Sequence, residues 1–519
     1  MERAICTLAL GGRYSIFVGS VITPPQKLQW EGVTIRAPAF TRAKAESKRA
    51  VAKKSQRLVT VLGVALACAL SGRTASAQDW PRFGWDVGRS SAPRVEMGIT
   101  VANVVSLERQ QVTLDGTVDA SAIYLHHVIV HGAAHDVVFV TTTYGKTIAI
   151  DADHGTVLWE YTPSSYAKLA GSYQVTTTTP VADPDRRFIY AASPDGAIQK
   201  LAVSDGRVVW RTAVTRLPRR EKLAAPLNIF RGRVFAATGG YIGDAPPYQG
   251  HVAMLDAETG ALLHVWNSLC SDRHELLDPS SCPASGSAIW GRAGAVIDSV
   301  TGTVYVATGN GPWDGRSNWG DAVIALDADL AGIVGNYTPE NTDELAASDA
   351  DLGSTAPARL GRGLVAQGGK DGKIRLLDWS AIRGGVPHRG GEVEVGSTPS
   401  GSDLFTAVAV LHTDSVTRMF AADNGGTAAW TVSPRGLDPI WRNGHAGTSP
   451  VVADGLVFVY DPAGGVRVYE AFSGRAIATL ECGPGHWNSP IIAAGRIVLP
   501  EGNSNDRELS GVLDIWRVP

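Results

Sequence analysis

The chain has 519 residues, and its charges nearly balance, with 47 Lys and Arg against 50 Asp and Glu. It is rich in Gly (58) and Trp (14) and holds only 4 Met and 5 Cys. Because no segment shows strong helical periodicity, this composition excludes a helical bundle and favours an all-β protein of many short strands.

Residues 51–77 have the pattern of a secretory signal peptide. Basic residues within 53–57 precede an apolar run over 58–70, and residues 75–77 form an Ala-Ser-Ala cleavage site. The apolar run is too short to span a membrane. We therefore predict cleavage near Ala77, a periplasmic or secreted product, and no transmembrane segment in the mature chain.

The segment 1–50 is basic and irregular, which is unusual before a signal peptide. We expect it to be a non-native extension, produced by a misassigned start codon, or a disordered one. A lipoprotein site at Leu66-Ala67-Cys68 is a less favoured alternative, because apolar residues and the Ala-Ser-Ala site follow it. Residues 1–77 hold 12 Lys and Arg but only 3 Asp and Glu, so the mature chain has a net charge of −12. Such a charge disfavours nucleic acid as a partner.

One short sequence motif recurs along the rest of the chain: an apolar strand, a turn with Asp or Gly, and a second apolar strand that often carries Trp. The clearest copies span 147–160, 200–210 and 253–263. The residues that follow the first strand of each copy are Asp151, Ala202, Asp256, Asp327, Asp378, Thr431, Glu470 and, more loosely, Trp516.

A unit this short cannot bury its apolar face alone, so neighbouring copies must stack on one another. We therefore predict that residues 78–519 form a single all-β domain, an eight-bladed β-propeller of four-stranded antiparallel blades. A β-sandwich with chance similarity between strands is the alternative. In five copies a small residue plus Pro marks an earlier strand: Thr179-Pro180, Ala225-Pro226, Ala356-Pro357, Ser449-Pro450 and Ser489-Pro490. Since Pro has no N–H to donate, we expect it where an innermost strand begins.

Three cysteines remain after signal cleavage: Cys270, Cys282 and Cys482. Export permits a disulfide, and we expect Cys270 to pair with Cys282. The chain has no Cys-x-x-Cys-His motif for covalent haem, so any redox enzyme built on it needs a separate electron acceptor.

Two stretches break the repeat rhythm, 288–313 and 336–354, and the second is followed by Gln367-Gly-Gly-Lys-Asp-Gly372. In these stretches the sequence resembles the quinoprotein alcohol and methanol dehydrogenases, which bind pyrroloquinoline quinone (PQQ) in an eight-bladed propeller. The resemblance covers most of residues 79–518, beginning at Asp79-Trp-Pro-Arg-Phe-Gly84.

The resemblance implies a cofactor site. Trp290 matches the family's Trp-Gly floor under the quinone, and Asn310, in Gly-Asn-Gly-Pro-Trp, matches a calcium ligand. Asp351 takes the position of the catalytic carboxylate, which is also placed to bind the metal, and Lys370 matches a cation that contacts the quinone. The implied cofactors are PQQ and Ca²⁺ or a lanthanide. In this scheme Asp351 is the general base, Lys370 stabilises negative charge, and Trp290 stacks on the planar ring.

The sequence also departs from the family. Tyr241 stands where a Glu ligand to the metal is expected, and Asp244 is the nearest carboxylate that could substitute. The family's pair of adjacent cysteines is replaced within 173–179.

Each candidate residue also has a purely structural interpretation. Trp290 could pack between blades as Trp159, Trp210 and Trp266 do, and Asn310 could occupy a left-handed turn. Asp351 could cap a turn, and Lys370 could be a solvated hairpin charge. His445 and His486, which precede the Ser-Pro strands of the last two copies, could face the channel or simply form rim turns.

Two functions remain open. The first is a periplasmic PQQ-dependent dehydrogenase that oxidises an alcohol or sugar hydroxyl. The second is a non-catalytic PQQ-repeat propeller that acts as a binding or outer-membrane assembly scaffold. The four retained residues favour the enzyme, whereas Tyr241 and the missing cysteine pair favour the scaffold.

Overall fold

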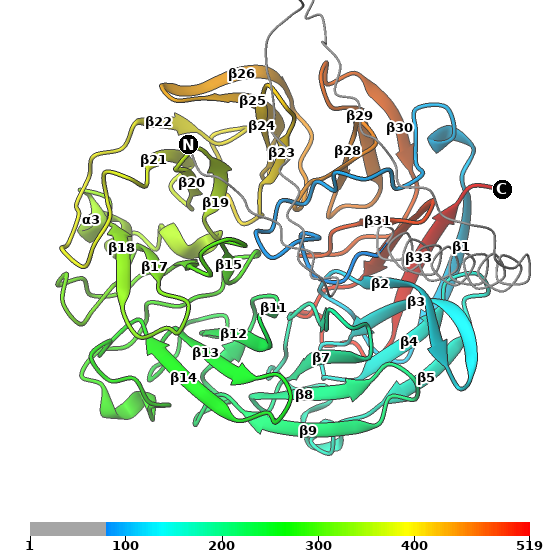
Figure 1. The fold of residues 1–519 in the computed structure, drawn as a ribbon, viewed down its shortest axis with the longest axis horizontal. Coiled ribbons are helices and arrows are strands. Elements are labelled where there is room, and N and C mark those ends of the chain that lie inside the picture. Colours follow the sequence, from blue (N-terminus) through cyan, green and yellow to red (C-terminus); the bar gives the residue numbers. More distant parts are fainter. Residues whose placement is uncertain (1–78) are drawn as a thin grey trace, which may run out of the picture. The chain divides into compact units, whose positions relative to one another are not determined.

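The computed structural model describes residues 79–519, and this part of the chain is an all-β, eight-bladed propeller (Figure 1). Each blade is an antiparallel sheet, and in all but the last blade the strands come from consecutive parts of the chain. The predicted fold class is confirmed for the described residues. The predicted extension (1–50) and signal peptide (51–77) lie outside them.

The first four blades occupy the N-terminal half of the ring. Blade 1 holds β2 (Ile123–Val130), β3 (Ala133–Thr141), β4 (Thr147–Asp151) and β5 (Val157–Tyr161). Blade 2 holds β6 (Val181–Ala182), β7 (Phe188–Ser193), β8 (Ala197–Ala202) and β9 (Val208–Ala213). Blade 3 holds β10 (Lys222–Leu223), β11 (Asn228–Phe230), β12 (Arg233–Gly239), β13 (His251–Asp256) and β14 (Leu262–Asn267). Blade 4 holds β15 (Val296–Ile297), β16 (Val304–Ala307), β17 (Val323–Leu326) and β18 (Ile333–Tyr337).

The other four blades complete the ring. Blade 5 holds β19 (Ala358–Gly361), β20 (Leu364–Gly368), β21 (Lys373–Asp378) and β22 (Glu394–Ser397). Blade 6 holds β23 (Ala409–His412), β24 (Thr417–Ala422), β25 (Thr427–Ser433) and β26 (Gly436–Asn443). Blade 7 holds β27 (Val451–Ala453), β28 (Leu456–Tyr460), β29 (Val466–Glu470) and β30 (Ala476–Leu480). Blade 8 holds β31 (Ile491–Ala493), β32 (Arg496–Glu501), β33 (Gly511–Arg517) and β1 (Glu108–Leu114).

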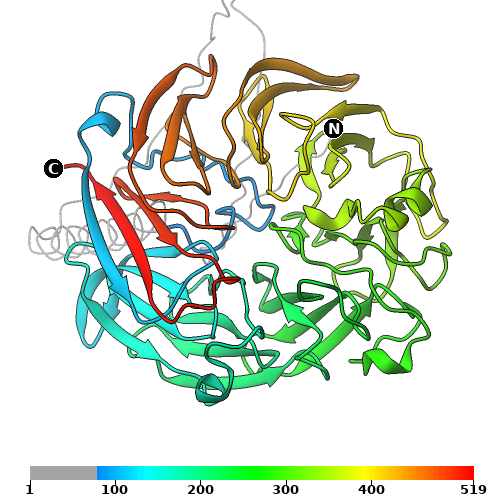
Figure 2. The same ribbon diagram turned by 180° about the vertical axis from the view of Figure 1, so that it is seen from behind.

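Blade 8 joins the two ends of the domain. Its outermost strand is β1, which pairs antiparallel with β33 so that Val112 lies opposite Leu513 (Figure 2). This exchange explains why the last sequence copy, at Trp516, is incomplete: its fourth strand comes from the other end of the domain. Because one blade takes strands from both ends of the domain, this pairing closes the ring.

Short helices occupy some of the connections. These are α2 (Tyr166–Leu169), α3 (Thr342–Ala347) and the 3₁₀ turns η2 (Val104–Ser106), η3 (Pro279–Ser281) and η4 (Leu352–Ser354). Within residues 79–519, no helix combines the length and the apolar character needed to cross a membrane.

The repeated Trp and Gly of the sequence meet between neighbouring blades. The Trp159 indole N–H donates to the Val203 carbonyl of the next blade at 2.8 Å, and a Cβ on Gly206 would lie 2.6 Å from the ring. Two other tryptophans pack in the same way. The Trp210 indole donates to the Ala257 carbonyl and its ring lies against Gly260, and the Trp441 indole donates to the Ala471 carbonyl with its ring against Gly474. The turn glycine leaves room for the ring, so the repeat is also the unit of blade-to-blade packing.

The Pro residues lie largely where the sequence predicts. Pro180, Pro357, Pro450 and Pro490 each directly precede the innermost strand of a blade. Pro226 differs, because it falls between β10 and β11 and interrupts the inner edge of blade 3. Since Pro donates no backbone hydrogen bond, the pairing with β12 is split into two short segments there.

Cysteine pairing also follows expectation. Cys270 and Cys282 form a disulfide that closes the connection between blades 3 and 4, with a Cα–Cα distance of 6.2 Å. Cys482 is a free, half-buried thiol.

Candidate functional site

The four residues singled out by the sequence come together where blades 4 and 5 meet near the central channel. Trp290 precedes β15, Asn310 lies between β16 and β17, Asp351 precedes η4, and Lys370 lies in the turn between β20 and β21. The two sequence stretches that break the repeat therefore build one locality.

Asp351 and Lys370 form an ion pair in this locality. The Lys370 Nζ lies 2.6 Å from Asp351 Oδ2, and the Lys370 backbone N–H donates to the Asp351 carbonyl at 3.0 Å. Asp351 is only 7% exposed, and burial raises the pKa of its carboxyl while Lys370 opposes that rise. The pKa of Lys370 is raised in turn, because the two aspartates beside it outweigh its own burial. The lysine is therefore not a solvated hairpin charge.

Asn310 is tied to both ends of the Asp-Ala-Asp segment. Its backbone N–H donates to Asp351 Oδ1 at 2.6 Å, and its Nδ2 donates to Asp349 Oδ1 at 2.8 Å. Its Oδ1 is buried and has no hydrogen-bond partner. An acceptor without a partner next to two carboxylates is unusual, since buried polar atoms are normally hydrogen-bonded.

Asp321 is a member of the site that sequence reasoning missed. It is fully buried, and its Oδ1 accepts the Leu352 N–H at 2.9 Å, which fixes the residue directly after Asp351. Its Oδ2 has no partner. Burial, followed by repulsion from Asp351, raises the pKa of Asp321 to about 8. A signal was available: a carboxylate directly before the apolar strand 322–326 is unusual unless the chain has a use for it.

Three half-buried aromatic side chains, Trp290, Phe405 and Trp487, line the channel beside these charges. They come from blades 4, 6 and 8, and their ring centroids lie 6.0 Å and 5.3 Å apart in that order. The Lys370 ammonium lies 5.6 Å from the centre of the Trp290 ring. Unlike Trp159, Trp290 thus has a cation beside its ring and other channel aromatics as neighbours. Phe405 follows a polar loop and carried no sequence signal.

Tyr241, which replaces the expected Glu ligand, packs away from the carboxylates. Its hydroxyl donates to the Pro218 carbonyl at 3.0 Å, and its ring meets Tyr173 edge to face at 5.5 Å. Asp244 is exposed and accepts the Tyr248 hydroxyl at 2.9 Å. The pKa of Tyr248 is raised, first by burial and then by the nearby carboxylates, of which Asp244 contributes most.

A second charged group lies deeper in the channel, around Arg292. Its Nη2 donates to the Trp487 carbonyl at 2.9 Å and lies 4.0 Å from Asp119 Oδ1, and its guanidinium stacks 5.3 Å from the Trp487 ring. Asp119 Oδ2 lies 2.9 Å from Nδ1 of His486. Burial alone would raise the pKa of Asp119, but His486 and Arg292 hold it below its usual range. His486 therefore contributes to the channel, whereas His445 is exposed.

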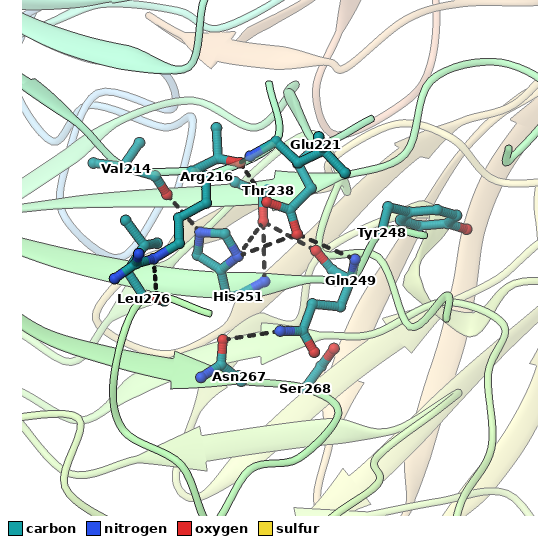
Figure 3. Close-up of polar contacts among 12 residues, drawn as sticks. Val214, Arg216, Glu221, Thr238, Tyr248, Gln249, His251, Asn267, Ser268 and Leu276 are labelled. Atoms are coloured by element: carbon teal, nitrogen blue, oxygen red, sulfur yellow. Dashed lines mark hydrogen bonds and ion pairs between the residues drawn. The ribbon is translucent and has the colours of Figure 1, made fainter. Parts of the chain in front are cut away.

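A buried polar network anchors the inner edge of blade 3 (Figure 3). The Glu221 carboxylate accepts hydrogen bonds from the Thr215 hydroxyl and from the Gln249 N–H, and it lies 3.9 Å from His251 Nδ1. His251 Nε2 donates to the Val214 carbonyl at 2.7 Å. Burial raises the pKa of Glu221, and the proximity of His251 opposes that rise. This network holds β10 in place from the side of blade 2.

Among the described residues, one cluster of three His, Cys, Asp or Glu side chains has its ligand atoms within 4.8 Å of one another. It consists of Cys482, Glu501 and Asp514, in blade 8. It contains none of the predicted metal ligands, and Arg109 pairs with both of its carboxylates, with Asp514 at 2.9 Å and with Glu501 at 3.2 Å. The cluster is therefore not the predicted metal site.

Comparisons with known proteins agree with this architecture. The profile of a family described as outer membrane protein assembly factor BamB matches residues 63–311. The dehydrogenase subunit of alcohol dehydrogenase (quinone) from Gluconobacter oxydans is 26% identical over 245 residues, which cover 40% of this chain and 31% of that protein. A polyvinylalcohol dehydrogenase of a Pseudomonas species is 24% identical over 328 residues, which cover 57% of this chain and 48% of the relative.

The chain thus spans less than half the length of these curated relatives. Among solved structures, the quinohemoprotein alcohol dehydrogenase of Comamonas testosteroni superposes with a TM-score of 0.62 at 16% identity, covering 85% of this chain and 80% of that one. This likeness concerns the fold. The chain is thus an eight-bladed β-propeller that is similar in sequence to quinoprotein alcohol dehydrogenases over part of its length.

Proposed function

We propose that this protein is a periplasmic quinone-dependent dehydrogenase that oxidises an alcohol or sugar hydroxyl. The observation that supports this most directly is the buried Asp351–Lys370 pair, which lies beside the half-buried Trp290 ring and the unpartnered Asn310 Oδ1. The names of the distant relatives agree with an alcohol as the substrate class.

The channel residues fit a planar quinone. Trp290 offers a partly open aromatic face, and Lys370 provides a positive charge over that face. Gly309 lies so close to Asp351 that an added Cβ would collide with its carboxylate, so the backbone lets the base approach Trp290 closely. When bound, an ortho-quinone such as PQQ supplies the two-electron sink that the side chains lack.

The residues fit a hard cation in part. Asn310 Oδ1 and Asp351 are oxygen donors of the kind that Ca²⁺ or a lanthanide prefers, and they would hold it. Tyr241 contributes no ligand, because its hydroxyl is turned toward Pro218. Asp244 would complete the set only after leaving Tyr248.

Asp351 is suited to serve as a general base. Burial raises the pKa of its carboxyl, as a general base requires, and the Lys370 ammonium opposes that rise. Its Oδ2 would accept the hydroxyl proton of the substrate once Lys370 turns from it toward the ring above Trp290. Asp321, through the Leu352 N–H, would hold the base in position.

The test is reconstitution of the mature apo-protein with PQQ and either Ca²⁺ or La³⁺. Binding is followed by quinone absorbance, and turnover by dye reduction over a panel of alcohols and sugars. We expect saturable binding and substrate-dependent dye reduction. Failure to bind PQQ at high-micromolar concentration would contradict the proposal.

A non-catalytic scaffold is the second candidate. Tyr241 favours it, since that side chain supplies no metal ligand, and so does the match of residues 63–311 to the assembly-factor family. PQQ binding without dye reduction on any substrate, under either metal, would support this function instead.

A further inference from the structure

Lys222 lies on the innermost strand of blade 3 and faces the channel site. Its neighbours on both sides, Glu221 and Leu223, point into the blade: Glu221 joins the network of Figure 3, and Leu223 packs in the core between blades 2 and 3. Because side chains alternate along a strand, Lys222 points to the opposite face.

That opposite face adjoins Trp290. Lys222 pairs with Gly239 on β12, and the two residues of such a pair share a face of the sheet. A Cβ added to Gly239 would lie 3.1 Å from the Trp290 Cβ. The lysine therefore emerges next to the aromatic floor of the proposed quinone site, on a side remote in sequence from Asp351 and Lys370.

Lys222 is also the exception among the lysines of residues 79–519. Lys168 and Lys373 are exposed, and the other three have carboxylate partners: Lys146 with Asp115 and Glu160, Lys200 with Glu258, and Lys370 with Asp349 and Asp351. Lys222 is half-buried, yet its ammonium makes no hydrogen bond or ion pair with any described residue. A partly desolvated cation with no partner costs free energy in the empty protein.

The net charge around Lys222 is positive, because Lys222 and Arg292 share a single nearby carboxylate, that of Asp119. Burial lowers the pKa of its ammonium to about 8, Asp119 raises it, and Arg292 lowers it further. Asp119 lies 4.0 Å from Arg292 and is held by His486, so it neutralises at most one of the two cations. One positive charge thus stays uncompensated beside Trp290, Phe405 and Trp487.

We propose that Lys222 is an anion-binding residue that recognises a carboxylate on a planar aromatic ligand stacked in the channel, with Arg292 reinforcing the local positive potential. The class of ligand rests on the proposed function, because PQQ is a planar tricarboxylate. The same chemistry would also hold a small free anion, which the experiment separates.

The experiment measures dissociation constants by quenching of tryptophan fluorescence at pH 7 for wild type, Lys222→Met and Lys222→Arg. Three probes are used: PQQ, the carboxylate-free planar quinone 1,10-phenanthroline-5,6-dione, and the aromatic diacid pyridine-2,6-dicarboxylate. Lys373→Met, which removes an exposed lysine of β21, is the matched control. The melting temperature of each ligand-free variant is recorded alongside.

We expect Lys222→Met to weaken binding of PQQ and of the diacid at least ~10-fold, to change binding of the phenanthroline quinone less than ~2-fold, and to raise the melting temperature. Lys222→Arg should restore most of the affinity, and Lys373→Met should match wild type. A side chain needed only for folding would instead lower the melting temperature and weaken all probes together.

The outcomes separate this inference from the dehydrogenase proposal. If wild type does not bind PQQ but binds the diacid in a manner that depends on Lys222, the quinone proposal fails and the anion site stands. If PQQ binds equally to wild type and Lys222→Met, the anion site is overturned while the quinone proposal survives. If wild type binds neither PQQ nor the diacid, both fail.

Discussion

The tryptophans between the blades and the tryptophan at the channel occupy opposite kinds of environment. Trp159 is 6% exposed, its indole N–H is satisfied by Val203, and Gly206 leaves room for its ring. Trp290 is half-buried, its ring does not pack on a turn glycine of the next blade, and Lys370 and Phe405 lie beside it. One residue type thus serves packing in one place and exposes an aromatic face in the other.

The same contrast extends to the polar groups around them. Between the blades, the indole N–H groups of Trp159, Trp210 and Trp441 each donate to a backbone carbonyl of the next blade. Near the channel, Asn310 Oδ1 and Asp321 Oδ2 have no partner, and Lys222 has no counter-ion among the described residues. Other buried polar atoms without a partner occur elsewhere in residues 79–519, but here they lie beside a buried ion pair and half-buried aromatic rings, a combination typical of a ligand site. Substitutions should therefore separate into those that alter stability and those that alter function.

The largest expected effect is functional, at Asp351. Replacing it by Asn keeps the acceptor for the Asn310 N–H but removes the base, so dye reduction with PQQ should fall about 10³-fold while the PQQ dissociation constant changes little. Stopped-flow reduction at saturating substrate measures the loss. If Asp351→Asn instead abolishes PQQ binding and retains no folded signal, the residue is structural and the comparison between the two regions breaks down.

The two tryptophans provide the next test. Trp159→Ala should lower the free energy of unfolding by about 3–4 kcal/mol, because it empties a packed seat and leaves the Val203 carbonyl without a donor. Trp290→Ala should cost about 1 kcal/mol or less but weaken PQQ binding at least ~10-fold. Urea denaturation and fluorescence titration measure the two quantities, and Trp159→Phe separates the ring from its N–H. Equal losses of stability would mean that Trp290 is a packing residue.

The sequence allowed the fold to be predicted because each blade repeats one packing unit, in which a turn glycine of one blade receives the tryptophan of another. It also indicated that Trp290, Asn310, Asp351 and Lys370 lie close together, because they match the cofactor-site motifs of the quinoprotein dehydrogenases in the same order along the chain. Asp321, Phe405 and Lys222 were missed for a physical reason. They come from three different blades, and although Asp321 stands out as a carboxylate before an apolar strand, the local sequence does not show that the ring brings the three residues together.

The division of the innermost strand of blade 3 could not be predicted from the sequence either. Small-residue–Pro pairs predict where inner strands begin, but not that Pro226 divides one of them into β10 and β11. The two residues of β10 lie opposite the end of β12, which is why Lys222 faces Gly239 and the Trp290 side of the site.

A smaller effect is expected at the disulfide, which lies outside the repeat. Cys270 and Cys282 are separated by 12 positions, and closing a loop of this size stabilises a protein by about 2–3 kcal/mol in chain-entropy terms. The double Ser variant should lose this amount in urea denaturation. PQQ affinity should stay within ~2-fold of wild type, because the loop is held by Asn267 of β14, by Arg216 of the β9–β10 connection and by hydrogen bonds of Ser271 to Ser317 and Trp319, not by Trp290, Asp351 or Lys370. A large loss of affinity would place the loop within the functional region.

The smallest effect, and the sharpest test of the unsatisfied channel, is the pH dependence of stability at Lys222. The pKa of its ammonium is about 8 in the folded protein and 10.5 when unperturbed. Below pH 8 the lysine is charged in both the folded and the unfolded state, so wild type bears the full cost of the unpaired cation. Between pH 8 and 10.5 the folded protein has released this proton while the unfolded chain still holds it, so that cost declines as pH rises.

Lys222→Met should therefore be more stable than wild type by roughly 1–3 kcal/mol at pH 7, and this advantage should shrink steadily toward pH 10. Taking the difference between the two proteins cancels the titration of tyrosines and of the other lysines. Chemical denaturation at several pH values measures it, and Lys373→Met should show no such trend because that side chain is exposed. A difference that is constant with pH would mean that Lys222 is fully hydrated, and the contrast between satisfied blade contacts and an unsatisfied channel would then rest on Asn310 and Asp321 alone.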